Sequence, residues 1–212
     1  MTDARSIING AGAMRAEAVE TLSRAFADDP ALAWIIPNPT TRARRLPRFF
    51  DWLYADHLRH GIILTSPDRT AVTLWRVPGK VHYHDPMSLA EAWRMLAIFG
   101  PNILRADRVG KRLARHVPAG EDHLYLRYVG VHPTAQGKGW GGLAIRAGIA
   151  EANRLGVDTC LETAKESNVA IYQRLGFDVV EERQVLSGPT LRTIVRPRGR
   201  LLNLPSGQTR RA

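Results

Sequence analysis

The chain has 212 residues, of which 44% are hydrophobic and 24% charged, and its formal net charge is +10 at pH 7. These values describe one globular domain of ordinary size and exclude a disordered or fibrous chain. No apolar run reaches about 18 residues, which excludes a membrane-spanning helix. The N-terminal MTDARSIING lacks a signal pattern, so we expect a cytoplasmic protein.

The first half of the chain predicts two long helices and a hairpin. Apolar residues at helical spacing mark 14–27 and 41–60, and Asp28-Asp29-Pro30 is expected to end the first of these helices. We expect Gly61 to cap the second helix and Trp34-Ile35-Ile36 to form an apolar segment between prolines. Strands are predicted on both sides of a turn, at 62–65 and 71–76.

The second half alternates helices and strands. Ser88 and Glu91 form a capping box at the start of a helix, and Gly156 is expected to cap another. The predicted order is helices over 88–99 and 103–116, a strand over 124–131, a helix over 142–155, a strand over 159–163, a helix over 168–175 and a hairpin over 177–186 and 191–195. This order predicts a mixed α/β (α+β) fold, with a mostly antiparallel twisted sheet flanked by helices.

The stretch from Val129 to Gly142, VGVHPTAQGKGWGG, carries the clearest functional signal. An apolar strand leads into a glycine-rich loop, and a helix follows directly. Glycines allow the backbone to approach a ligand closely, and the N–H groups of the loop and of the helix N-terminus can bind an anion. The stretch therefore predicts a site for a phosphorylated small molecule.

Two other phosphate-binding loops fit this stretch less well. A nucleotide triphosphatase loop needs Ser or Thr after its lysine, whereas Gly139 follows Lys138. A dinucleotide loop matches Gly137, Gly139 and Gly142, but in that loop the strand runs straight into the first glycine. Here residues 132–136 intervene, and too little chain follows for a doubly wound sheet.

The pattern resembles the GNAT family of N-acetyltransferases, whose pyrophosphate loop reads Gln/Arg-x-x-Gly-x-Gly/Ala. Gln136, Gly139 and Gly141 match that loop. The family's later helix and its exit are matched by Asn168, Tyr172 and Gly176-Phe177. The resemblance extends over about 124–180 and implies the GNAT fold, with a V-shaped splay between the two central strands.

The resemblance also implies acetyl-CoA as the cosubstrate and no metal. It places the binding of acetyl-CoA at Val129, Gly130 and Val131 on the central strand, at Gln136, Gly137, Lys138, Gly139, Trp140, Gly141 and Gly142 in the loop, and at Asn168 and Tyr172. It further implies that Tyr172 is the general acid for the departing thiolate, because a phenol is protonated at neutral pH.

The sequence leaves the general base open. Glu162 is the first candidate, because the alternation of its strand directs it toward the thioester. His123 and Tyr125 on the central strand are the next candidates, and a water relay without a dedicated base is an equal alternative. His82 and His84 are expected either to line the acceptor pocket or to be exposed.

The expected reaction is the transfer of an acetyl group to the amine of a small molecule by direct attack in a ternary complex. An antibiotic or small metabolite is implied by a faint resemblance to acetyltransferases of the puromycin-resistance type, carried by Phe26-Ala27-x-Asp29-Pro30, Trp34, Pro37 and Leu74-Trp75-x-x-Pro78-Gly79. A protein or peptide amine is an alternative acceptor. A second alternative is a non-catalytic acyl-CoA-binding module that contacts nucleic acid through its arginine-rich stretches.

The expected organisation is a single acetyltransferase domain over 1–200. It holds a cofactor-binding core over 123–185 and a helical insertion over 81–122 that forms part of the acceptor wall, and a basic, mobile tail follows over 201–212. The basic stretches are interpreted as a solvated face, so nucleic acid is not expected, and a homodimer is left open. Cys160 is expected to be a buried, inert thiol, and the seven scattered histidines do not form a zinc pattern.

Overall fold

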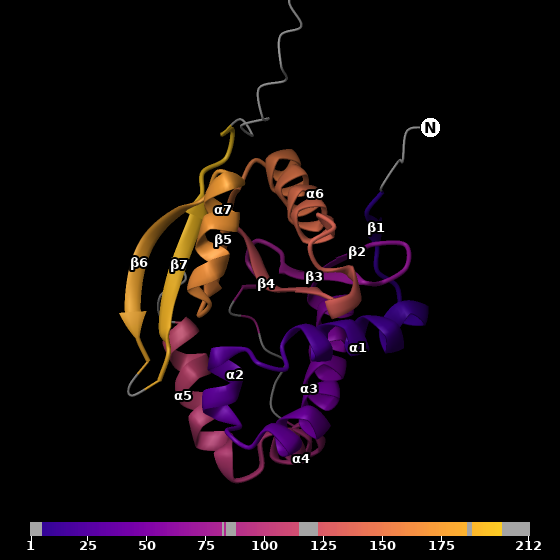
Figure 1. Ribbon diagram of the computed structural model, residues 1–212, viewed down its shortest axis with the longest axis vertical. Coiled ribbons are helices and arrows are strands. Elements are labelled where there is room, and N and C mark those ends of the chain that lie inside the picture. Colours follow the sequence, from indigo (N-terminus) through magenta and orange to yellow (C-terminus); the bar gives the residue numbers. More distant parts are fainter. Residues whose placement is uncertain (1–5, 82, 84–87, 115–122, 186–187, 201–212) are drawn as a thin grey trace, which may run out of the picture.

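The computed structural model of the chain describes residues 6–81, 83, 88–114, 123–185 and 188–200. Within them, seven strands form one open sheet of order β1-β2-β3-β4-β5-β7-β6 (Figure 1). Only β4 and β5 pair in parallel, and the other neighbours are antiparallel. The strands are β1 (Ile8–Asn9), β2 (Gly61–Thr65), β3 (Ala71–Arg76), β4 (His123–Val131), β5 (Asp158–Thr163), β6 (Asp178–Gln184) and β7 (Thr190–Arg196). The predicted mixed, mostly antiparallel fold is confirmed.

Helices cover both faces of this sheet (Figure 1). The α-helices are α1 (Arg15–Ala25), α2 (Pro30–Ile35), α3 (Pro39–His60), α4 (Leu89–Phe99), α5 (Ile103–Ala114), α6 (Trp140–Leu155) and α7 (Val169–Arg174). Single 3₁₀ turns precede or join them at η1 (Gly12–Met14), η2 (Gly100–Asn102), η3 (Pro133–Ala135) and η4 (Glu166–Asn168). All the predicted strands are present, with ends shifted by a few residues. The long predicted helices, over 14–27, 41–60, 88–99, 103–116 and 142–155, correspond to α1, α3, α4, α5 and α6.

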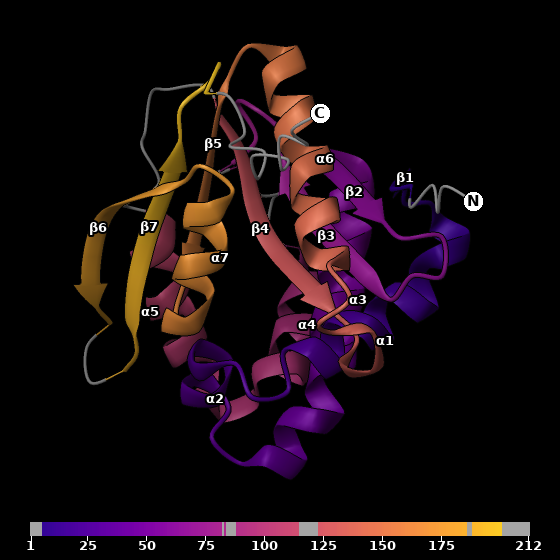
Figure 2. The same ribbon diagram turned by 45° about the horizontal axis from the view of Figure 1, so that its top comes forward.

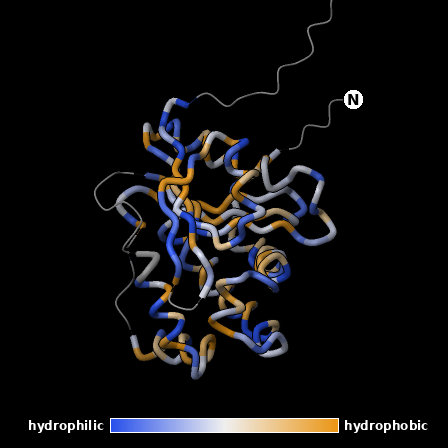
Figure 3. Tube along the Cα trace, turned by 60° about the vertical axis from the view of Figure 1, so that its left-hand side comes forward, coloured by the Kyte–Doolittle hydropathy of each residue, from blue (hydrophilic) through white to orange (hydrophobic). Residues whose placement is uncertain are grey.

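The core has two parts, one on each face of the sheet. On one face, residues of α1 to α5 pack against β2 and β3, and Leu22, Phe50, Leu53 and Leu74 are fully buried there. On the other face, α6 and α7 pack against the central strands around the fully buried Trp75 and Leu124. Alternation along the strands separates the two sets, because successive side chains point to opposite faces. Figure 3 shows apolar segments concentrated along the strands in the middle of the molecule.

The region after α1 differs from the sequence-based prediction. α1 ends at Ala25, before the predicted stop at Asp28-Asp29-Pro30, and Asp29 begins the additional short helix α2, which includes Trp34 and Ile35. Asp29 Oδ1 accepts hydrogen bonds from the N–H groups of Ala31 and Leu32, and Pro30 occupies the first helical position. This is a strong helix start, but six residues are too few for apolar periodicity to mark it.

Gly61 caps α3, as predicted, and its N–H donates a hydrogen bond to the His57 carbonyl. Gly61 has φ −151°, an extended conformation, and it is the first residue of β2. By contrast Gly156 ends α6 with φ +71°, as predicted. His82 and His84, Arg115 and the basic segment 201–212 lie outside the described residues.

Candidate active site

The two central strands separate part of the way along their length. β4 pairs with β5 only from His123 to Leu126, opposite Asp158 to Leu161. β4 nevertheless continues to Val131, and on its other edge it remains paired with β3 over that whole length. Among the described residues, the β5-facing edge of β4 beyond Leu126 therefore has no strand partner. This is the predicted V-shaped splay, and Figure 2 shows β4 and β5 diverging.

An irregularity in β4 lies where the splay begins. Leu74 of β3 pairs with Tyr128, and the next residue, Trp75, pairs with Leu126. Arg127 is therefore an extra residue, and such a bulge bends a strand and increases its twist. The bulge coincides with the end of the β4–β5 pairing, and Val129 to Val131 lie beyond it, paired with β3 alone among the described strands.

The glycine-rich loop lies at the end of β4. Gly137 has φ +75° and Gly139 has φ +83°, conformations that favour glycine, and a Cβ at either position would meet only open space. Helix α6 begins directly afterwards at Trp140, so its first N–H groups are directed at this open space. The loop is thus shaped to receive an anion at a helix N-terminus.

Two side chains support this loop. The Gln136 amide donates a hydrogen bond to the Val131 carbonyl at 3.1 Å and so ties the loop to the end of β4. Arg146, nearly two turns into α6, is a cation beside the loop that was not among the predicted site residues. A Cβ added to Gly142 would lie 3.2 Å from its guanidinium. The available sequence signal was the spacing of four residues between Gly142 and Arg146, which places both on one face of the helix.

A cavity of about 1010 Å³ connects the splay with the helices below the sheet. Its walls come from α2, α3, α4, α5, β4, β5 and α7. Val129, Glu162, Asn168, Tyr172 and Tyr125, all predicted site residues, line it. His123 is buried at the paired end of β4 and is not part of the lining, and the loop residues 136–142 lie outside it. The predicted insertion contributes Val81, Ser88, Glu91, Met95, Phe99, Ile103 and Val109 among other residues.

One wall of the cavity is aromatic. The Tyr128 ring contacts Phe26 at 5.3 Å and Phe49 at 5.9 Å between centroids, and Phe49 lies 5.7 Å from Phe99 and 6.2 Å from Trp52. We call Phe26, Phe49, Trp52, Phe99 and Tyr128 the aromatic wall. Burial raises the pKa of Tyr128 to about 12, so its hydroxyl stays neutral. Such a wall suits an apolar ligand or a cation over its ring faces.

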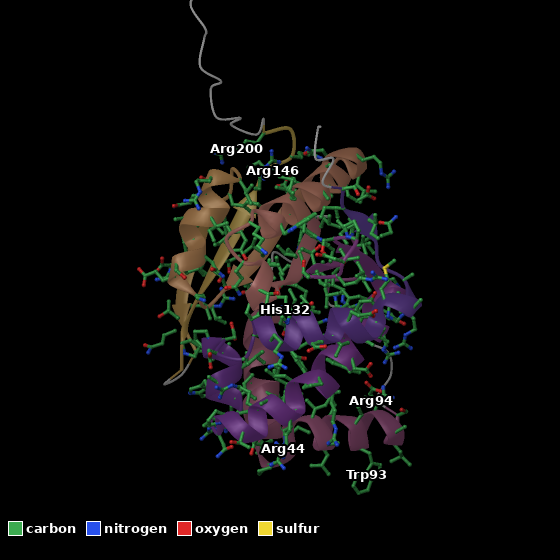
Figure 4. The ribbon with its side chains drawn as sticks, turned by 45° about the vertical axis from the view of Figure 1, so that its right-hand side comes forward. Arg44, Trp93, Arg94, His132, Arg146 and Arg200 are labelled. Atoms are coloured by element: carbon green, nitrogen blue, oxygen red, sulfur yellow. The ribbon has the colours of Figure 1, made fainter. Side chains whose placement is uncertain are left out.

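Charged side chains lie on α4 and α5 away from the splay, and most of those described are paired. Glu91 accepts hydrogen bonds from the Trp52 indole and, at 2.9 Å, from Arg94. Asp107 is 2.8 Å from Lys111. Figure 4 shows Trp93 and Arg94 at the end of the molecule opposite Arg146. The exposed residues of α4 therefore lie far from Arg146 on α6.

Tyr172 lies on α7 and is only 5% exposed. Burial, followed by the negative charge of Asp29, raises the pKa of its phenol. The proton is therefore retained at neutral pH, as a general acid requires. Asn168 lies at the N-terminal end of the same helix and makes no side-chain cap, so its amide is available to the cavity.

Glu162 is held by several donors. Its carboxylate forms an ion pair with Arg183, and it accepts hydrogen bonds from the Tyr125 hydroxyl at 3.3 Å and from Thr193 at 3.4 Å. Its side chain is 3% exposed and that of Arg183 is 5% exposed. An arginine beside a carboxylate favours the charged form. The role of Glu162 as a base stays a prediction.

Sequence reasoning missed Asp29 as a site residue. Its carboxylate caps α2 and also lines the cavity. Its effect on Tyr172 places it in the electrostatic field of the predicted acid. The signal in the sequence was Asp before Pro at a helix start, which indicates a cap but says nothing of a cavity.

Comparisons with known proteins agree with this geometry. Residues 73–177 match the model of the acetyltransferase (GNAT) family. The chain is 27% identical over 180 residues to an uncharacterized N-acetyltransferase, C550.08, of Schizosaccharomyces pombe, covering 76% of this chain and 69% of that protein. The chain belongs to the GNAT family of acetyltransferases and is an acyltransferase enzyme.

Solved structures show the same fold. A crystal structure from Corynebacterium glutamicum described as histone acetyltransferase HPA2 and related acetyltransferase superposes with a TM-score of 0.71, at 24% identity over 93% of this chain and 98% of that one. Arylalkylamine N-acetyltransferase 2 from Aedes aegypti gives a TM-score of 0.56, at 14% identity over 92% and 99% of the two chains.

Two further observations concern the described part of the chain. It contains no helix long and apolar enough to cross a membrane. Nor do its His, Cys, Asp and Glu residues gather in a group of three that could hold a metal ion.

Proposed function

We propose that this enzyme transfers the acetyl group of acetyl-CoA to the amine of a small molecule, by direct attack in a ternary complex. The observation that carries the proposal is the continuity between the unpaired edge of β4 and the cavity beneath it. One ligand can lie along the edge while a second reaches its end from the helical side.

The residues present fit acetyl-CoA. The open loop at Gly137 and Gly139, together with Arg146, suits a pyrophosphate. The free backbone of Val129 to Val131 suits an amide-bearing arm that pairs like a strand, with Asn168 on the opposite side. Acetyl-CoA supplies an activated acyl group as a thioester. Tyr172 then donates its proton to the sulfur that leaves.

An acceptor with an apolar body fits the cavity better than a polypeptide does. The aromatic wall and the apolar residues of α2, α4 and α5 surround the inner space, and α4 and α5 cover it. The relatives named for histone and arylalkylamine substrates share only the fold at their level of identity. The choice of an acceptor with an apolar body therefore rests on the residues that line the cavity. An antibiotic or small metabolite with a primary amine meets the requirement.

The alternative of nucleic-acid binding gains little from the described residues of the basic α5. Lys111 pairs with Asp107. Arg105 donates to the Trp34 carbonyl at 3.4 Å and lies over the Trp34 ring. These contacts favour a structural and solvated face. Salt-dependent DNA binding without acetyl transfer would support the alternative instead.

Calorimetric titration with acetyl-CoA tests the first half of the proposal, with ATP and NADH as controls. We expect binding of acetyl-CoA alone. Equal binding of ATP or NADH, or none of acetyl-CoA, would overturn the assignment of the loop.

Thiol release with a panel of primary amines tests the second half. The panel contains 2-phenylethylamine, ethanolamine, spermidine and a lysine-containing peptide. We expect the highest kcat/KM for the amine with the apolar body. Preference for the peptide would favour the protein-acetylating alternative, and no release with any amine would contradict small-amine transfer.

A further inference from the structure

Asp29 presents a carboxylate to the cavity from the wall formed by α2. Both of its backbone hydrogen bonds, from Ala31 and Leu32 at 3.0 Å, fall on Oδ1. Within the described ranges of the chain, no hydrogen bond falls on Oδ2. Because Asp29 lines the cavity, the second oxygen is available to a ligand there. The cap fixes the direction of the carboxylate, since rotation would break both bonds to the helix.

The surroundings of Asp29 define what that oxygen can bind. Its charge acts on Tyr172 and Tyr128, which also line the cavity. Two cations, Lys165 and Arg42, act on it from other elements. Burial dominates these effects and raises the pKa of Asp29 above the ordinary value.

Arg42 does not neutralise Asp29 through a hydrogen bond. Its guanidinium donates to the carbonyls of Ala27 at 2.6 Å and Ile36 at 2.9 Å, and its remaining nitrogen lies 3.6 Å from Asp28. The arginine is therefore used to join the α1–α2 segment to α3. Asp29 places a partly buried carboxylate near neutral aromatic rings, which is a favourable place for an organic ammonium.

The geometry points to Asp29 as the catalytic residue that binds the ammonium of the acceptor and takes its proton, opposite the Tyr172 acid. This inference rests on the proposed function. It assigns the base to a helix cap in the N-terminal part of the chain rather than to Glu162 on β5, which lines the same cavity. It also fixes the orientation of the acceptor, with its amine between α2 and α7 and its apolar body against the aromatic wall.

The proton balance of the reaction closes with these two groups. The ammonium gives one proton to Asp29, which later releases it to water. The neutral nitrogen forms a bond to the acetyl carbonyl carbon, and the carbon–sulfur bond breaks. The sulfur takes the Tyr172 proton, and the proton lost by the new amide nitrogen restores the Tyr172 phenol. The products are the N-acetyl compound, the free thiol and one proton.

Asp29→Asn separates this role from the structural one. Asn is as good a helix cap as Asp, so α2 and the fold are retained while the charge and the proton acceptor are removed. Asp28→Asn is the matched control, because Asp28 is the adjacent residue with the same charge and its side chain is 98% exposed. Both variants are assayed by thiol release with acetyl-CoA and the best primary amine of the panel, and thermal unfolding verifies that both are folded.

We expect Asp29→Asn to lower kcat/KM by about 10²–10⁴-fold, the contribution of a positioned general base. Asp28→Asn should stay within about twofold. The pH profile gives the second readout. In the wild type, kcat/KM should be level between the pKa of Asp29 and that of the acceptor ammonium. In Asp29→Asn it should rise about tenfold per pH unit up to the pKa of the ammonium, because only free neutral amine can then react.

The outcomes are distinguishable. If the wild type releases thiol with the amines but Asp29→Asn has the same rate and the same pH profile, Asp29 is only a cap and this inference fails. If the wild type binds no acetyl-CoA or acetylates no amine, the proposed function fails, and the assignment of Asp29 fails with it.

Discussion

The Glu162 carboxylate on β5 is ion-paired with the Arg183 guanidinium on β6, and both side chains are almost fully buried. The pair bridges across β7, which lies between the two strands in the sheet. It joins the cavity wall to the C-terminal hairpin.

Glu162→Gln should therefore act first on stability. Removing one partner leaves Arg183 buried without its main counter-charge, so we expect the free energy of unfolding to fall by about 3 kcal/mol. We also expect kcat/KM to fall less than it does in Asp29→Asn. Urea unfolding and thiol release measure the two effects. A larger loss of activity than in Asp29→Asn, in protein that is fully folded, would assign the base to Glu162 instead.

Tyr172→Phe should affect the chemical step alone. The substitution removes only the hydroxyl from a buried ring that packs against Phe177 at 5.9 Å, so the helix and the cavity keep their shape. We expect kcat to fall by about 10²-fold or more and the Kd of acetyl-CoA to stay within about twofold. Steady-state kinetics and calorimetry report these separately. Unchanged turnover would remove Tyr172 from the mechanism.

Gly139→Asp should weaken the binding of acetyl-CoA. It places a negative charge and a side chain at φ +83°, in the open space of the loop. We expect Kd to rise by at least about 100-fold, because an anion would face a carboxylate. Gly79→Asp is the matched control, with a similar φ of +73° and open space in the turn after β3. If both variants bind acetyl-CoA equally, the loop does not hold its phosphates.

Cys160 should be unreactive in the folded protein. It is 1% exposed on β5, and burial raises the pKa of its thiol to about 12, so almost none is thiolate at pH 8. We expect negligible labelling by a disulfide reagent until guanidinium is added, and one thiol per chain afterwards. Rapid labelling of folded protein would show that β5 opens. The same labelling experiment measures how much the Cys160 thiol adds to the background signal of the thiol-release assay.

Two glycine substitutions should have opposite effects on stability. A Cβ at Gly148 on α6 would overlap the fully buried Trp75 indole, so Gly148→Ala should cost at least about 2 kcal/mol of unfolding free energy. Gly110 on α5 is exposed, and a Cβ added there would meet no atom of the described chain within 4 Å. Gly110→Ala should stabilise the protein by about 0.5–1 kcal/mol. Thermal unfolding of the two variants compares these effects, and equal melting temperatures would contradict the packing of α6 on Trp75.

The sequence by itself determined the features that depend on neighbouring residues. The path from β4 through the glycine loop to α6 is local, because positive φ at Gly137 and Gly139 and the helix start are properties of consecutive residues. The apolar spacing over 41–60 similarly predicted the helix that the structure shows as α3, and Phe50 and Leu53 of that helix are buried. The short helix α2 was not predicted, because its sequence signal is the Asp29 cap and its six residues show no apolar periodicity.

Only the tertiary structure decided the composition of the cavity. Its carboxylate, its phenol and its aromatic wall come from segments far apart in the chain, Asp29 on α2, Tyr172 on α7 and Phe49 on α3. No spacing in the sequence relates them, because α2 and α3 pack on one face of the sheet, α7 packs on the other, and only the folded chain brings all three to one cavity. The sequence also did not predict Arg183 as the ion-pair partner of Glu162, because the two residues lie on β6 and β5, which are separated by β7 in the sheet. Local backbone preference therefore determines the loop that suits a phosphate, and long-range packing determines which groups face the acceptor.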